Sequence, residues 1–97
     1  MIVSFKDRRT EDIFNGTNSR HTRNLDKSLL KVAVRRLDIL NYAAELADLL
    51  MPPGNKLEPL KGKLKGFYSI RVNSQWRLIF RWEASGPAEV EFVDYHS

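Results

Sequence analysis

Residues 67–82 read FYSIRVNSQWRLIFRW, and apolar side chains recur at every second position through both halves of this stretch. Such alternation is typical of half-buried β-strands, and Asn73-Ser74 supplies turn residues between the halves. One face of the first half carries Tyr68, Ile70 and Val72, and one face of the second carries Trp76, Leu78, Phe80 and Trp82. We interpret these faces as core surface, although aromatic residues in such rows also stack on RNA bases.

Helical patterns precede this hairpin. Asp7 is a suitable cap for a short helix that Asn15-Gly16 should end. A second helix should begin at the cap Asn24 and end before Pro52-Pro53-Gly54. Its apolar stripe has steps of three or four residues: Leu25, Leu29, Ala33, Leu37, Leu40, Ala44 and Ala47.

Short strands are predicted at both ends of the chain. Residues 2–5 should open the sheet, while Val90 and Phe92 mark a last strand after a turn at residues 84–87. Helices followed by an antiparallel meander predict an α+β fold. We therefore expect a single domain over residues 1–97, with a short N-terminal strand and two helices on one face of an antiparallel sheet with a mixed edge.

The net charge of +4 is unevenly distributed. Residues 54–82 hold seven basic side chains against Glu58 alone, whereas residues 83–97 hold four acidic side chains and no Lys or Arg. This concentration favours a surface for a polyanion over a merely solvated face. The chain has no cysteine, no apolar run of membrane-spanning length and no signal sequence, so we expect a cytoplasmic protein that uses no metal and no cofactor.

Two segments contain residues suited to phosphodiester chemistry. Residues 60–66 are almost purely cationic, and Asp94-Tyr95-His96 follows the last predicted strand. A histidine with a pKa near ~6.5 can deliver a proton near neutrality. Tyr95 would stack on a base or bond a phosphate, and Asp94 would orient His96 or a cation. Arg77 lies opposite the tryptophans, where an ion pair with Glu89 or Glu91 is the structural alternative.

Four motifs occur in order: LEPLKG (residues 57–62), GFYSIRV (66–72), QWRLIF (75–80) and VDYH (93–96). Together they resemble the HigB branch of the RelE/ParE toxins over nearly the whole chain. The resemblance implies a RelE-like fold and a bacterial type II toxin that cleaves mRNA in the ribosomal A site. It also implies inhibition by a helix-turn-helix antitoxin.

By position, the resemblance implies active-site roles for five residues: Lys61, Arg77, Asp94, Tyr95 and His96. Glu58 replaces a histidine of several relatives, and Asn73 replaces an arginine, for which Arg71 is a nearby substitute. In the expected mechanism the RNA 2′-hydroxyl attacks the adjacent phosphate, His96 is the acid and Arg77 stabilises the phosphorane. Lys61 stabilises charge or acts as base, Glu58 is a second candidate base, and Tyr95 positions the nucleotide.

The remaining expectations concern partners. Contacts with RNA or the ribosome are assigned to Lys63, Lys65, Arg71, Asn73, Lys27, Lys31 and Arg35. The partners implied are a HigA-like antitoxin, the 70S ribosome and mRNA, with DNA reached only through the antitoxin complex and no membrane. The alternative is a non-catalytic basic module that blocks the ribosome or another target, as ParE-like gyrase inhibitors do, although those relatives lack the Asp-Tyr-His cluster.

Overall fold

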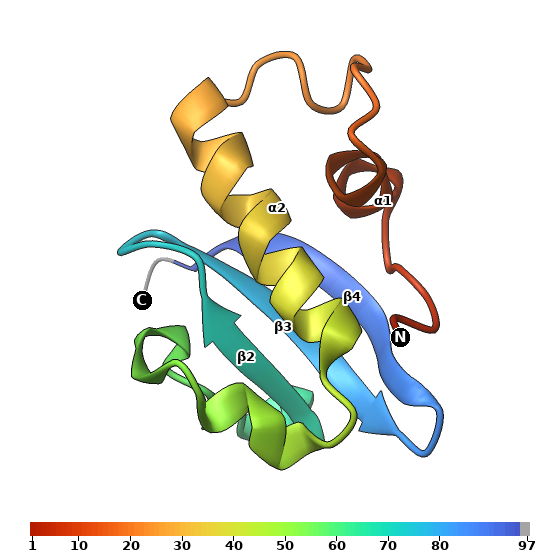
Figure 1. The fold of residues 1–97 in the computed structure, drawn as a ribbon, viewed down its shortest axis with the longest axis vertical. Coiled ribbons are helices and arrows are strands. Elements are labelled where there is room, and N and C mark those ends of the chain that lie inside the picture. The colour runs from red at the N-terminus through yellow and green to blue at the C-terminus, as the bar shows by residue number, and fades with distance from the viewer. Residues whose placement is uncertain (96–97) are drawn as a thin grey trace.

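The computed structural model describes residues 1–95 and has two helices on one face of a four-stranded sheet (Figure 1). The helices are α1 (Arg8–Asn15) and α2 (Lys27–Tyr42). The strands are β1 (Glu58–Pro59), β2 (Phe67–Arg71), β3 (Trp76–Glu83) and β4 (Gly86–Asp94), adjacent in that order and antiparallel throughout. Short 3-10 helices lie at Leu46–Leu50, Pro53–Asn55 and Gly62–Leu64. The predicted α+β class is confirmed.

The hairpin predicted from residues 67–82 forms as β2 and β3, with Ile70 opposite Leu78. The Asn73 side chain fixes the turn, because its Oδ1 accepts hydrogen bonds from the backbone N–H groups of Gln75 and Trp76, both at 2.8 Å. Leu78 and Phe80 are fully buried under the helices. The interpretation of this apolar face as core is therefore confirmed.

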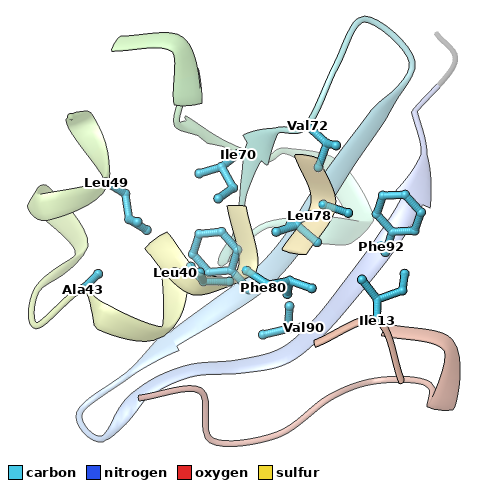
Figure 2. Close-up of a cluster of buried hydrophobic side chains, with 12 residues drawn as sticks. Ile13, Leu40, Ala43, Leu49, Ile70, Val72, Leu78, Phe80, Val90 and Phe92 are labelled. Carbon is cyan, nitrogen blue, oxygen red and sulfur yellow. The ribbon is translucent and has the colours of Figure 1, made fainter. Parts of the chain in front are cut away.

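The core lies between the helices and the sheet (Figure 2). Leu37 and Leu40 of α2 are fully buried, as are Val90 and Phe92 of β4. The Phe92 ring stacks on Trp76 with centroids 4.4 Å apart. Helix α1 adds Ile13, and its predicted limits are confirmed: the Asp7 carboxylate accepts from the Thr10 N–H at 2.9 Å, and Gly16 adopts the left-handed conformation at the other end.

The predicted opening strand is reduced to one parallel bridge between Phe5 and Val90. Strand β4 bulges between the pairs that Ile79 and Arg81 form, and Glu89 has a positive φ of 52°. The Val90 N–H and C=O then bond the carbonyl of Ser4 and the N–H of Lys6. Residues 2–5 thus run along β4 without extending the sheet as a regular strand.

Helix α2 is shorter than predicted at both ends. Its cap is Asp26 rather than Asn24, and hydrogen bonds from the Ser28 hydroxyl and backbone N–H lower the pKa of the Asp26 carboxyl. At the other end, the Asp48 carboxylate accepts from the N–H groups of Ala44 and Glu45 at 2.9 and 3.0 Å. These local bonds replace the next helical turn, so the expected extension to the Pro52-Pro53-Gly54 segment is wrong.

A buried polar contact joins α2 to the segment before β1. Arg36 Nη1 donates to Asn55 Oδ1 at 2.6 Å, and Asn55 Nδ2 donates to the carbonyls of Leu49 and Met51 at 3.2 Å. Asn55 is fully buried. Because each of its side-chain polar atoms is bonded, this residue fixes the path of the chain into Lys56 and β1.

We predict that Asn55→Ala lowers the free energy of unfolding by about 2–3 kcal/mol, because it leaves buried carbonyls and an arginine N–H without partners. Asn18→Ala is the matched control, since Asn18 is exposed and should change stability by less than about 0.5 kcal/mol. Urea unfolding of both variants measures the difference. Equal stability of the two variants would contradict the role given to Asn55.

Candidate active site

A hollow of about 290 Å³ opens on the sheet face that the helices leave uncovered, where the β2–β3 turn meets the end of β4. Its lining comes from that turn and from the chain on either side: Lys56, Arg71, Asn73, Ser74, Gln75, Arg77 and Tyr95. Three of these side chains are cationic. The hollow is therefore basic and open to solvent, which suits an anionic ligand.

Arg77 lies at the base of the hollow with its side chain only 13% exposed. Its guanidinium donates to Ser69 Oγ at 2.8 Å, to the Lys56 carbonyl at 3.3 Å and to Glu58 Oε1 at 2.9 Å. The Tyr95 ring lies 5.3 Å from the guanidinium carbon. These contacts from four segments fix the orientation of Arg77.

The ion pair of Arg77 is formed with β1 rather than with β4. Glu58 of β1 binds Arg77, while Glu89 binds Arg81 at 2.7 Å. The register explains this choice: Glu58 pairs with Ser69, which Arg77 also contacts, whereas Glu89 lies in the β4 bulge near Arg81. Within residues 1–95, no ion pair joins Arg77 to Glu89 or to Glu91, so the alternative of an ion pair with either residue is wrong.

The end of β4 is tied to the β2–β3 turn. Tyr95 N–H donates to the Gln75 carbonyl at 2.6 Å, and Gln75 Nε2 donates to Asp94 Oδ2 at 3.0 Å. These bonds bring Tyr95 to the rim of the hollow beside Arg77. His96 lies outside the described residues.

The lysines of the cationic segment after β1 lie outside the lining of the hollow. Lys61, Lys63 and Lys65 are exposed, form no ion pair among the described residues, and do not line the hollow. Arg71 and Asn73 do line it. Lys27, Lys31 and Arg35 are exposed on α2, in the helical layer on the other side of the sheet.

Four described residues of the site had no functional role predicted from the sequence: Lys56, Ser69, Ser74 and Gln75. Lys56 lines the hollow in a left-handed conformation and offers its carbonyl to Arg77; Ser69 is fully buried; Gln75 anchors the end of β4. Ser69 could have been found, because a small polar residue on the same strand face as Arg77 is a natural hydrogen-bond partner. Lys56 could not have been found from the sequence, because its position depends on the hydrogen bonds of the buried Asn55 side chain.

Two features are absent from the part of the chain that the structure describes. Residues 1–95 contain no cluster of three or more His, Cys, Asp or Glu side chains placed to hold a metal ion. None of the helices in these residues is long and apolar enough to cross a membrane.

Known proteins are similar to this chain in sequence and in fold. Residues 3–96 match the family described as the RelE-like toxin of type II toxin-antitoxin system HigB. The chain is 43% identical over 96 residues to Toxin HigB-1 of Vibrio cholerae, covering 99% of this chain and 98% of that protein. It is 34% identical over 61 residues to Endoribonuclease HigB of Proteus vulgaris, covering 63% of this chain and 65% of that protein.

Solved structures support the fold at lower identity. The toxin in a heterotetrameric YoeB-YefM toxin-antitoxin complex from Staphylococcus aureus superposes with a TM-score of 0.64 at 21% identity, covering 100% of this chain and 99% of that chain. The match of the family model over residues 3–96 and the full-length similarity to a HigB toxin settle the relationship. The chain belongs to the HigB-like toxins, which are RelE-like toxins of type II toxin–antitoxin systems.

Proposed function

We propose that this protein is an endoribonuclease toxin that cleaves mRNA in the A site of the ribosome and so inhibits translation and growth. The observation that carries the proposal is the fixed Arg77 beneath Tyr95 in a basic hollow. The hollow, at about 290 Å³, is close to the lower limit of about 300 Å³ for small-molecule pockets, which suits a single nucleotide. The name of the Proteus vulgaris relative, an endoribonuclease, supports the same activity.

The chemistry requires no group beyond the RNA and the protein. The 2′-hydroxyl gives its proton to a base, for which Lys61 is the first candidate, and its oxygen attacks the adjacent phosphorus. The bond to the 5′-oxygen breaks, that oxygen takes a proton from His96, and the products are a 2′,3′-cyclic phosphate and a 5′-hydroxyl. Arg77 stabilises the phosphorane, because a guanidinium donates parallel hydrogen bonds that match phosphate geometry. Tyr95 positions the nucleotide by stacking, Asp94 orients His96 or a cation, and His96 protonates the leaving oxygen.

Lys61 has a role in this scheme although it does not line the hollow. Its exposed amine lies on the segment that follows β1, the strand of Glu58. We assign it to charge stabilisation or proton abstraction once RNA and the ribosome cover the site, because desolvation favours the neutral amine. The ribosome contributes by holding the mRNA in line for attack.

The expected partners follow from the family. A HigA-like helix-turn-helix antitoxin would neutralise the toxin, and DNA would be reached only through that complex. The solved YoeB-YefM complex from Staphylococcus aureus, a heterotetrameric toxin-antitoxin assembly, supports an antitoxin partner. Ribosomal RNA would meet the exposed cations, including Lys63 and Lys65 beyond β1 and the Lys27/Lys31/Arg35 ladder on α2.

The second candidate is a non-catalytic basic module that occupies the ribosome or another target, such as gyrase. It is favoured by the many exposed cations that lie outside the hollow. The two candidates differ in one respect: a catalytic site can lose its activity while ribosome affinity is retained, whereas a blocking module loses both together.

We predict that Arg77→Lys lowers the rate of mRNA cleavage by about 100-fold or more, because the lysine keeps the charge but cannot make the forked contact. The measurement is mapping of cut sites on a translating mRNA in a purified cell-free system. Arg8→Lys is the control, since Arg8 is an exposed residue of α1. Near-ultraviolet circular dichroism checks that each variant is folded.

Three outcomes are distinguishable in this experiment. Cuts at A-site codons that disappear in Arg77→Lys, with ribosome affinity retained, support the proposal. Cuts that persist at the wild-type rate remove Arg77 from the mechanism. Inhibition of protein synthesis without any cut favours the blocking module.

Ribosome binding should depend on the α2 cations. We predict that replacing Lys27, Lys31 and Arg35 together by Gln weakens ribosome binding and lowers the slope of log affinity against log salt by about 2–3. The control replaces Lys6, Arg8 and Arg20 by Gln, which removes the same charge elsewhere on the surface. Equal loss in both triple variants would contradict docking through α2.

A further inference from the structure

In the free protein, Arg77 already forms an ion pair with the Glu58 carboxylate. A guanidinium has five N–H donors, and the contacts with Ser69, Lys56 and Glu58 occupy three of them. At most two therefore remain for a substrate. Of the three acceptors, Glu58 alone carries a charge, and its carboxylate faces the guanidinium at 2.9 Å.

The surroundings differ for the two partners of this ion pair. The Arg77 side chain is 13% exposed, whereas that of Glu58 is 51% exposed. Ser69 and the Lys56 carbonyl hold Arg77 from the protein side, so its orientation does not depend on Glu58 alone. Glu58 is thus free to turn toward solvent while Arg77 stays in place.

Glu58 also changes the charge of the hollow. Arg71 and Arg77 are direct partners across the β2–β3 pair, and like charges in that relation repel one another. The Glu58 carboxylate offsets this repulsion. Its departure, or its replacement by a phosphate, leaves two arginines that both face an incoming anion at the hollow.

We propose that Glu58 competes with the RNA phosphate for Arg77 and thereby sets the affinity of the site for its substrate. The inference rests on the proposed function, in that RNA is the ligand of the hollow. Glu58 leaves the guanidinium when the phosphate arrives and returns when the product departs. This role is the opposite of a general base, for which the carboxylate would have to remain next to the 2′-hydroxyl and accept its proton.

The test compares Glu58→Gln with the wild type. Gln keeps the length and the Oε1 acceptor for Arg77 but removes the charge, so the orientation of the arginine is preserved. Glu11→Gln is the matched control: it removes the same charge from another Arg–Glu pair, the exposed one with Arg8 on α1, in the other layer of the fold.

The probe is a dinucleotide with a 2′-O-methyl group, which binds without being cleaved. Its dissociation constant is measured by NMR titration of the Arg77 side-chain N–H signal. We expect Glu58→Gln to bind about two- to fivefold more tightly than wild type, the range set by partly exposed ion pairs. Glu11→Gln should bind like wild type. Any of three results would overturn the proposal. Glu58→Gln could bind the dinucleotide no more tightly than wild type, both variants could gain the same affinity, or none of the three proteins could bind it.

Cleavage of translating mRNA distinguishes Glu58 as a competitor for Arg77 from Glu58 as a general base. Glu58→Gln should cleave at least as fast as wild type at limiting ribosome concentration. Loss of cleavage at wild-type dinucleotide affinity would make Glu58 the base and overturn the competing role. Failure of the wild type to cleave at all would instead refute the proposed function, while the binding comparison would still report on Glu58.

Discussion

The alternation of side chains along β3 constrains both the core and the candidate site. Leu78 and Phe80 point toward the helices and are fully buried, which fixes the strand in its register with β2 and β4. Arg77 then has to point toward the opposite face, next to Ser69. A slip of one residue would exchange the two faces, so burial of the apolar residues is also what holds the arginine in the hollow.

A second constraint reaches the site from the helical layer. Arg36 of α2 bonds Asn55, and the residue that follows, Lys56, lines the hollow and accepts a hydrogen bond from Arg77. The chain then enters β1, where Glu58 completes the ion pair. The site thus depends on the packing of the helices as well as on the sheet, although the site and the helices lie on opposite faces of the sheet.

Local signals in the sequence predicted the elements that depend on local chemistry. The caps Asp7 and Gly16, the β2–β3 turn and the apolar face of β3 follow from neighbouring residues, and so does the placement of Arg77 away from the core. The end of α2 could not be predicted, because Asp48 bonds backbone groups that a helix would otherwise use. The Arg77–Glu58 pair depends on the β1–β2 register, which two residues of strand do not reveal.

The proposed function depends on attack by the RNA 2′-hydroxyl at the Arg77 hollow. The most direct test is end-group analysis of RNA fragments from a translation reaction, with the products of the toxin's own cut separated from later processing by rapid quenching. We expect a 2′,3′-cyclic phosphate on the upstream fragment and a 5′-hydroxyl on the downstream one. Fragments with a 3′-hydroxyl and a 5′-phosphate would contradict this mechanism, because that chemistry requires water rather than the 2′-hydroxyl as the nucleophile.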